Sequence, residues 1–584
     1  MRRGGRRLIA GTGSVQCTVS MQPALPRYTT PFPGLSLIQQ GQRAVVTLGS
    51  ETLLLLAALA FTFAYNGALW QLLFAGRDLA GPRQIALVAG AFIAVTALQF
   101  AGLALLLPRR AVRPALALLF PATAAASYFM ERFGVLLDSD MLRNVLHTDP
   151  AEAGELLTSG LVTHLVLFGL VPAVALAFVR LTPRPLPRAL GIRAAAIAIA
   201  LAVATAAVLP QYQSAAALVR GHRNARHLVT PTNYLAALYR LAGRAMRSPD
   251  AAPVPLGTDA HRLIAATAHR RPTLLVLAVG ETVRSANFGL SGYARQTTPE
   301  LAALDPIVFP QVAACGTSTE VSLPCMFAPV GRRQYDEDRI RGQESLLHVL
   351  HRAGFQIRWI DNQSGCKGVC AGLPTERIDG AADPALCNGE HCFDGILLPR
   401  LAQAVADERG DLVVVLHTLG NHGPAYSHRY PPQFRRFSPT CEDADLGNCT
   451  RQQVVNAYDN AVLYSDHVLA TTIAWLQQQH DRETAFIYVS DHGESLGENG
   501  LYLHGLPYGI APREQREVPM VMWVSPQLAA AARLDLRCLA QRAREPSAHD
   551  HLFHSVLGLL DVATRVHEPA LDVFAGCRER AGQV

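Results

Sequence analysis

The sequence is almost without lysine: Lys367 is the only one, although lysine and arginine together number 52. This arginine bias by itself says nothing about function. The arginines are dispersed along the chain and no nucleic-acid-binding motif accompanies them, so the net charge of +6 does not indicate a nucleic-acid partner. Lys367 is present either by chance or because its function requires lysine. The lysine ammonium is a compact charge, whereas the arginine guanidinium is planar, so the two are not interchangeable.

The N-terminus lacks the apolar segment of a secretory signal peptide. Its first twenty residues instead carry four arginines: Arg2, Arg3, Arg6 and Arg7. Two interpretations stay open. The segment is a cytoplasmic tail, or the gene start is over-extended and Met21 is the true initiator.

Long apolar runs are present and lie near the front of the chain. Five of them are mostly of bilayer-spanning length, roughly 20 residues: Leu53–Ala75, Ile85–Leu107, Ala115–Met130, Leu161–Val179 and Ala194–Leu209. A buried core helix can explain one such run but not five in succession. The sequence therefore predicts a five-helix transmembrane domain.

Arginines orient the predicted spans. They gather before the first span, between the second and third, and between the fourth and fifth, whereas the alternate loops hold few. Positive charge on the cytoplasmic side puts the N-terminus inside, so five crossings place everything after about Gln211 outside. We divide the chain into a cytoplasmic tail (1–45), a transmembrane domain (46–212), a connecting segment (213–258) and a catalytic domain (259–584).

Three short apolar runs in the last part of the chain each end in a potential metal ligand. Thr273–Val279 leads to Glu281, Ala485–Val489 leads to Asp491 and His492, and Leu412–Leu416 leads to His417. Ligands bind at the carboxyl ends of strands in open α/β sheets, and mixed oxygen and nitrogen donors suit Zn²⁺. His417 is more simply a solvated loop residue. Two further runs, Ile357–Ile360 and Val518–Val524, can complete the sheet, and Gln452–Gln479 is the clearest helix.

Cysteine usage agrees with an exterior location. Ten of the eleven cysteines follow the last predicted span. Four close pairs and one looser pair predict disulfides in an oxidising compartment: Cys315/Cys325, Cys366/Cys370, Cys387/Cys392, Cys441/Cys449 and Cys538/Cys577. The alternative is a zinc ribbon made by Cys366, Cys370, Cys387 and Cys392.

A hydroxyl cluster, Thr317-Ser318-Thr319, precedes a plausible helix start at Glu320–Leu323. A helix N-terminus favours a negative phosphoryl group, and Zn²⁺ lowers the pKa of a bound hydroxyl. The cluster can supply a nucleophile or simply cap the helix, and from the residues alone any of the three hydroxyls fits.

Several motifs together resemble one family. They are Gly280-Glu281-Thr282, Asn287–Tyr293, Cys315–Thr319, Asn421–Tyr426 and Ser490–Gly500. In this order they closely resemble the lipid A phosphoethanolamine transferases, membrane-anchored members of the alkaline phosphatase-like superfamily, and the resemblance covers about residues 45 to 570. It implies an N-terminal α-helical transmembrane domain plus a C-terminal α/β alkaline phosphatase/sulfatase-like domain.

The resemblance also implies roles for individual residues. Thr319 would be the nucleophile and would form a Zn²⁺ site with Glu281, Asp491 and His492, with a second ion as a possibility. Substrate-binding residues would be Asn144, Glu152, Lys367, His422 and His504. Of these, His422 and His504 would bind phosphate or a second metal ion, and Asn144 and Glu152 would contact lipid near the membrane, with ordinary loop polarity as the alternative.

The implied reaction transfers phosphoethanolamine from phosphatidylethanolamine to a lipid A phosphate through a threonine intermediate. It would lower the negative charge of the outer membrane and so raise resistance to cationic peptides such as polymyxin. We expect a monomer in the inner membrane, with its catalytic domain in the periplasm. Three alternatives remain: a transferase that acts on the lipopolysaccharide core sugar, a periplasmic phosphatase or sulfatase, and a non-catalytic membrane sensor.

Overall fold

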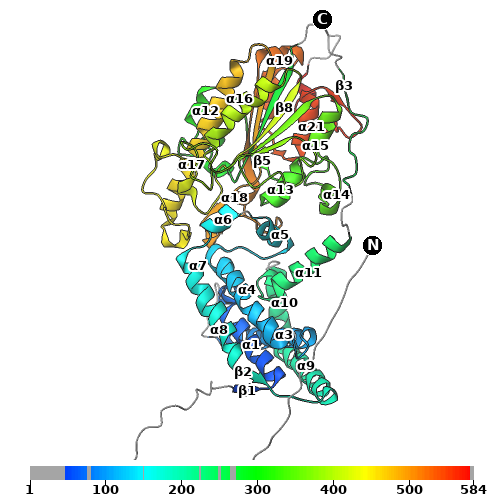
Figure 1. The fold of residues 1–584 in the computed structure, drawn as a ribbon, viewed down its shortest axis with the longest axis vertical. Helices are drawn as coiled ribbons and strands as arrows, with labels where there is room; N and C mark the ends of the chain where they lie inside the picture. The colour runs from blue at the N-terminus through cyan, green and yellow to red at the C-terminus, as the bar shows by residue number, and fades with distance from the viewer. Residues whose placement is uncertain are drawn as a thin grey trace, which may run out of the picture. The chain divides into compact units, whose positions relative to one another are not determined.

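The computed structural model describes residues 46–74, 81–148, 150–221, 225–247, 252–263 and 271–578. The predicted cytoplasmic tail, residues 1–45, lies outside these ranges. The described chain comprises an apolar helical region followed by an α/β domain (Figure 1).

Helices dominate the described residues between 46 and 247. They are α1 (Ser50–Ala64), α2 (Gly67–Phe74), α3 (Pro82–Leu106), α4 (Val112–Phe133), α5 (Ser139–His147), α6 (Pro150–Glu155), α7 (Ser159–His164), α8 (Val171–Ala175), α9 (Leu186–Val208), α10 (Tyr212–Gly221) and α11 (Thr232–Arg247). A π-helical stretch, Leu165–Leu170, joins α7 to α8. A parallel pair of three-residue strands, β1 (Val46–Leu48) and β2 (Val179–Leu181), lies beside them.

Three described helical stretches are long and apolar enough to cross a membrane: Gln84–Leu106, Ser159–Phe178 and Leu186–Gln211. A fourth is obtained if α1 and α2, which meet at a bend of 55°, count as one broken span. The third predicted span, Ala115–Met130, lies in α4, which is long enough at 22 residues but is not among the helices apolar enough to cross a membrane. The described helices therefore support three or four of the five predicted spans, and the number of crossings stays a prediction.

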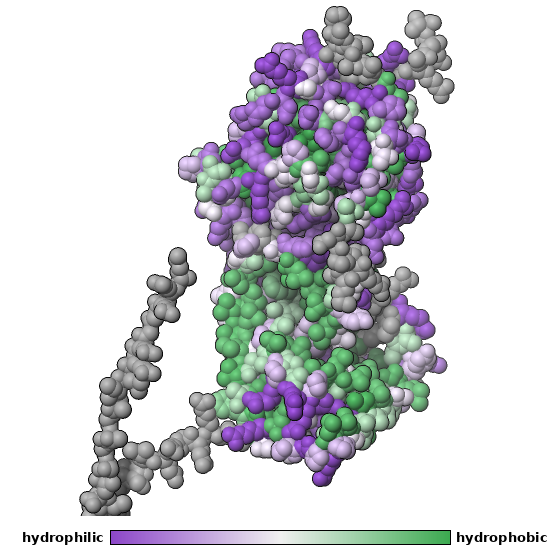
Figure 2. All heavy atoms as spheres, turned by 45° about the vertical axis from the view of Figure 1, so that its right-hand side comes forward, coloured by the Kyte–Doolittle hydropathy of each residue, from purple (hydrophilic) through white to green (hydrophobic). Residues whose placement is uncertain are grey.

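Apolar side chains of these helices point outward. Phe63, Leu105, Leu118 and Leu186 are each more than 70% exposed. Figure 2 shows hydrophobic residues gathered over the helical region and hydrophilic residues over the α/β domain. An apolar surface of this extent is stable only in an apolar solvent, so the helices form a membrane-embedded region.

The α/β domain is built on an eight-stranded sheet of order β13-β5-β12-β9-β4-β8-β6-β7. Its strands are β4 (Thr273–Gly280), β5 (Ile307–Ala313), β6 (Gln356–Asp361), β7 (Thr375–Arg377), β8 (Leu412–His417), β9 (Glu483–Ser490), β12 (Glu517–Val524) and β13 (Ser547–Ala548). The pairs from β9 through β7 are parallel, whereas β12 is antiparallel to both of its neighbours. Strands β4, β8 and β9 are buried along their whole length because helices cover both faces of the sheet.

The helices on each face follow from the two apolar clusters that enclose the sheet (Figure 1). One face packs against α13 (Thr319–Met326), α15 (Leu346–Arg352), α19 (Pro526–Ala531), α20 (Leu536–Arg542) and α21 (Asp550–Leu559). The other packs against α12 (Pro299–Ala303), α16 (Leu397–Asp407) and α17 (Arg451–Gln477). This arrangement places α13, and with it Thr319, on the first face.

The five predicted runs and the predicted helix coincide with β4, β6, β8, β9, β12 and α17. Strand β5 was not predicted. Pro310 interrupts its apolar run, and the pairing register of β5 with β12 shifts between Val518 and Met520. A proline is tolerated there because a bulge spares it a ladder hydrogen bond.

Five disulfides lie in the α/β domain: Cys315–Cys325, Cys366–Cys370, Cys387–Cys392, Cys441–Cys449 and Cys538–Cys577. These are the pairs that the spacings predict. Because Cys366, Cys370, Cys387 and Cys392 are used in two of them, they do not form the alternative zinc ribbon.

Candidate metal and phosphoryl-transfer site

The order of the strands brings the predicted ligands together. Strand β4 pairs in parallel with β9, and Gly280 lies opposite Ser490. The residues that follow, Glu281 on one strand and Asp491 and His492 on the other, therefore meet at the same sheet edge. All three side chains are fully buried.

Thr319 faces this group from the first turn of α13. Ser318, with extended backbone, precedes the helix as its N-cap. The Thr319 hydroxyl donates to Glu281 Oε2 at 2.9 Å and lies 3.3 Å from His492 Nε2. The neighbouring Thr317 hydroxyl is engaged elsewhere, since it donates to the Leu506 carbonyl at 2.6 Å. Among these two hydroxyls, only that of Thr319 touches the carboxylate group.

The buried donors fit a divalent cation. Glu281, Asp491 and His492 each offer one ligand atom within 4.8 Å of the others. Glu281 Oε1 and Asp491 Oδ2 are buried without a hydrogen-bond partner, an arrangement that costs free energy unless a cation compensates it. His492 Nδ1 contacts the Gly493 carbonyl at 2.9 Å, which leaves Nε2 directed at the carboxylates. Two carboxylate oxygens, one imidazole nitrogen and a hydroxyl match the preferences of Zn²⁺.

The charges at this site interact strongly. Burial raises the pKa of Glu281, but the hydrogen bond and charge of His492 outweigh it and hold that pKa below its ordinary value. Burial and the charge of Glu281 raise the pKa of Asp491 to about 6. Burial lowers the pKa of His492, yet the two carboxylates outweigh it and raise that pKa to about 10. The pocket thus favours positive charge, which a metal ion can supply instead of a proton.

A second group adjoins the first. His492, Glu494 and His504 also place one ligand atom each within 4.8 Å of one another. His504 Nδ1 lies 2.8 Å from Glu494 Oε2, whose other oxygen accepts from the Tyr426 hydroxyl at 2.6 Å. The His422 ring centroid is 5.7 Å from that of His504. The His504 ring centroid is 4.4 Å from that of His492, so His504 adjoins the first group and His422 lies beside His504.

Two polar residues near the carboxylates were not recognised from the sequence. Gln363 Nε2 donates to Glu281 Oε2 at 3.1 Å. His417 was interpreted as a solvated loop residue, and that interpretation is wrong: it is the last residue of β8, fully buried, with Nδ1 2.9 Å from Asp361 Oδ2. The error arose because the strand extends one residue beyond its apolar run.

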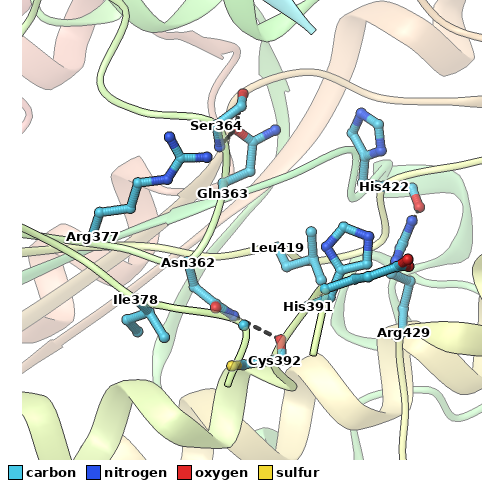
Figure 3. Close-up of a pocket in the computed structure, with 12 residues that line it drawn as sticks. Asn362, Gln363, Ser364, Arg377, Ile378, His391, Cys392, Leu419, His422 and Arg429 are labelled. Atoms are coloured by element: carbon cyan, nitrogen blue, oxygen red, sulfur yellow. Dashed lines mark hydrogen bonds between the residues drawn. The ribbon is translucent and has the colours of Figure 1, made fainter. Parts of the chain in front are cut away.

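A polar pocket opens beside these residues (Figure 3). Gln363, Ser364 and Arg377 line one part of it, and His391, His422 and Arg429 line another. Lys367 contacts its edge, because its ammonium donates to the Ser364 hydroxyl at 2.7 Å. No periodicity or spacing in the sequence indicates Arg377, His391 or Arg429.

The predicted lipid-contacting residues lie in the α5–α6 segment, residues 139–148 and 150–155. Asn144 is half-buried in α5. The side chain of Glu152 lies outside what the structure describes. Glu155, the last residue of α6, pairs with Arg429, which lines the pocket.

Comparison with known proteins agrees with this architecture. A sulfatase family model matches residues 273–562, and a model for phosphoethanolamine transferase EptA/EptB matches residues 95–246. The fold and site thus define a sulfatase-type domain of the alkaline phosphatase-like class, joined to apolar helices.

Individual relatives are similar over most of the chain. Phosphoethanolamine transferase EptA of Escherichia coli K12 is 37% identical over 469 residues, 80% of this chain and 86% of the relative. Phosphatidylethanolamine transferase Mcr-1 of E. coli is 38% identical over 72% of this chain and 79% of its own. The structure of the integral membrane lipooligosaccharide phosphoethanolamine transferase A from Neisseria meningitidis superposes with a TM-score of 0.88 at 35% identity, covering 92% of this chain and all of that one. The chain belongs to the EptA/EptB family of phosphoethanolamine transferases.

Proposed function

We propose that this protein transfers phosphoethanolamine from phosphatidylethanolamine to a phosphate of lipid A through a covalent intermediate on Thr319. One observation carries the proposal: the Thr319 hydroxyl, at the start of α13, contacts both Glu281 and His492 in a buried, cation-favouring site. No comparable contact is made by the hydroxyl of Thr317.

The reaction consists of two in-line displacements. In the first, Thr319 Oγ1 forms a bond to the phosphorus of phosphatidylethanolamine, and the bond from phosphorus to the diacylglycerol oxygen breaks. His504 or His422 delivers a proton to the departing alkoxide. In the second, an oxygen of a lipid A phosphate forms a bond to the phosphorus of the phosphoethanolamine group on Thr319, the bond from phosphorus to Thr319 Oγ1 breaks, and Oγ1 regains its proton. Thr319 is the first residue of α13, and a helix N-terminus favours the negative charge of the phosphoryl oxygens.

Glu281, Thr319, Asp491 and His492 would hold Zn²⁺ at this site. When bound, the ion would lower the pKa of the threonine hydroxyl and neutralise charge on the phosphoryl group. His504 and Glu494 supply the additional donors that a second ion would require.

The proposed substrates account for the membrane-embedded helices. Both are lipids, so an enzyme that acts on them works at a bilayer surface. We place the helices in the inner membrane and the catalytic domain, with its disulfides, in the periplasm. The enzyme would act as a monomer.

A core-sugar acceptor is the second candidate. A relative named Kdo(2)-lipid A phosphoethanolamine 7''-transferase, from E. coli K12, is 32% identical to this chain over 297 residues, although these cover only 51% of the relative. The relatives named EptA cover much more of both chains, so the likeness to the 7''-transferase carries less weight.

Replacing Thr319 with alanine tests the nucleophile. We expect transfer to fall to background while the thermal unfolding midpoint stays close to that of the wild type. Thr317→Ala is the matched control, since its hydroxyl is committed to Leu506 and activity should persist. Mass spectrometry of the wild-type enzyme incubated with donor should locate a phosphoethanolamine adduct on Thr319. An adduct on Thr317 or Ser318 contradicts the assignment.

Expression in a polymyxin-sensitive Gram-negative host tests the acceptor. Each transferred group places an ammonium beside a lipid A phosphate, so we expect resistance to rise and the mass of lipid A to increase by phosphoethanolamine. Glu281→Ala and Asp491→Ala should remove both effects, and Lys367→Arg should reduce them. Modification of core sugar alone would contradict the acceptor and leave the threonine chemistry intact.

A further inference from the structure

Glu155, the last residue of α6, is held by the catalytic domain. Its side chain is only 9% exposed. Arg429 Nη1 donates to Glu155 Oε1 at 3.0 Å, and Nη2 donates to Oε2. His391 Nε2 lies 3.3 Å from the same carboxylate. Burial raises the pKa of Glu155, but His391 and Arg429 outweigh it and lower that pKa to about 2, so the pair is ionic at neutral pH.

The same guanidinium group reaches the site. Arg429 Nε donates to the backbone carbonyl of His422 at 2.6 Å, and the Arg429 side chain is 1% exposed. A guanidinium group is planar and its donors have fixed directions. Because Nη1 and Nη2 are held by Glu155, the direction of Nε toward the His422 carbonyl is fixed as well. Figure 3 shows His391, His422 and Arg429 together along one wall of the pocket.

A second ion pair also joins the helical region to the α/β domain but does not involve the site. Arg132, in α4, donates to both oxygens of Asp445, with Nε–Oδ1 at 2.5 Å and Nη2–Oδ2 at 3.0 Å. Arg132 Nη2 also donates to Asn448. This pair resembles the Glu155 pair in its bidentate geometry, and it lies outside the site residues. A substitution that breaks the Arg132–Asp445 pair therefore tests the contact between the two regions without changing the site.

We propose that Glu155 is a positioning residue: through Arg429 it fixes His422, so the catalytic site is complete only when the α5–α6 segment is docked. The inference rests on the proposed function, in which His422 acts on the phosphoryl group. It adds a carboxylate from outside the α/β domain to the residues on which turnover depends.

Kinetics of the full-length enzyme in detergent, with a short-chain phosphatidylethanolamine donor, test this role. Glu155→Gln keeps the shape but removes the charge, and we expect kcat to fall by about 10- to 100-fold, the range typical when a residue supporting a site ligand is lost. KM for the donor should stay near the wild-type value. Asp445→Asn should leave kcat near the wild-type value, because it breaks only the other ion pair.

Arg429→Lys keeps the test valid if Glu155→Gln does not fold, and a double variant tests whether the two changes break the same connection. Arg429→Lys preserves the charge but cannot hold both partners in one fork, so its kcat should fall as in Glu155→Gln. The double variant Glu155→Gln/Arg429→Lys should be no slower than either single variant, because both changes break the same connection. Equal losses of kcat in Glu155→Gln and Asp445→Asn would overturn the proposal.

Chemical modification of His422 supplies a readout that needs no turnover. His422 is 7% exposed, so diethyl pyrocarbonate should modify it slowly relative to the exposed His480. Glu155→Gln should speed modification of His422, and Asp445→Asn should not. An unchanged rate in Glu155→Gln would overturn the positioning role. Absence of transfer by the wild-type enzyme would instead count against the proposed function, and the modification rates would still decide whether Glu155 holds His422.

Discussion

Leucine side chains are buried in the central sheet but exposed on the apolar helices. Leu275, in β4, is fully buried by helices on one face of the sheet. Leu105, in α3, is 74% exposed. Both belong to nearly continuous apolar runs, but the run of β4 has 8 residues and that of α3 has 25. The sheet excludes solvent by packing, whereas the helices present their apolar residues to the bilayer.

This difference shows where polar chemistry can be placed. In the sheet, burial of Glu281 and Asp491 raises their affinity for a cation, because water is excluded and the carboxylates lack sufficient hydrogen-bond partners. The outward face of the helices offers no such enclosure. The helices instead hold the protein in the lipid bilayer. The α5–α6 segment between them contributes Glu155, which pairs with Arg429 of the α/β domain.

The matched substitutions Leu275→Ala and Leu105→Ala should separate the two regions most strongly. Leu275→Ala leaves a cavity in the sheet and should lower the free energy of unfolding by about 2–5 kcal/mol. Leu105→Ala should cost far less, because lipid or detergent takes the place of the lost methyl groups. Thermal unfolding in detergent, followed by tryptophan fluorescence, measures both. Similar losses would contradict a lipid-facing position for Leu105.

Reduction of the disulfides should affect the α/β domain selectively. The Cys441–Cys449 bridge closes the loop that carries Asp445, and removing it with paired serine substitutions should cost about 2–4 kcal/mol. Thiol labelling of the unreduced protein should leave both cysteines unmodified. Stoichiometric labelling of either one would contradict the pairing.

A pH effect of smaller size should arise from His549. Its Nε2 contacts the Ser490 carbonyl at 2.9 Å, and the ring is buried beside the sheet. Burial lowers its pKa to about 4, so the folded protein keeps it neutral, whereas an unfolded histidine takes up a proton near pH 6.5. Its stabilising contribution is complete above that pH and falls as the pH is lowered toward 4, by roughly 1 kcal/mol at pH 5.5.

The measurement is the unfolding midpoint between pH 7.5 and 5.5 for the wild type and His549→Gln. The variant should show a flatter dependence on pH than the wild type. A steeper one would contradict a neutral buried ring.

Much of the site could be predicted because its residues follow apolar runs in the sequence. Glu281, Asp491 and His492 each come directly after a buried strand, and Thr319 begins a helix after a hydroxyl cluster. Four of the five disulfides could also be predicted, because the cysteines of Cys315–Cys325, Cys366–Cys370, Cys387–Cys392 and Cys441–Cys449 are only 4 to 10 positions apart. His417 was misjudged because one more residue belonged to its strand, and β5 was missed because Pro310 breaks its pattern.

What the sequence by itself determined was the division into long and short apolar runs, the ligand types at the strand ends and the family. Those features depend on period, length and residue type, which are local. Only the tertiary structure decided that Gln363 contacts Glu281, that His417 pairs with Asp361, and that Glu155 and Arg429 meet beside His422. Glu155 and Arg429 are separated by 274 positions, and no local pattern connects them. They meet because the α5–α6 segment packs against loops that extend from the carboxyl edge of the sheet.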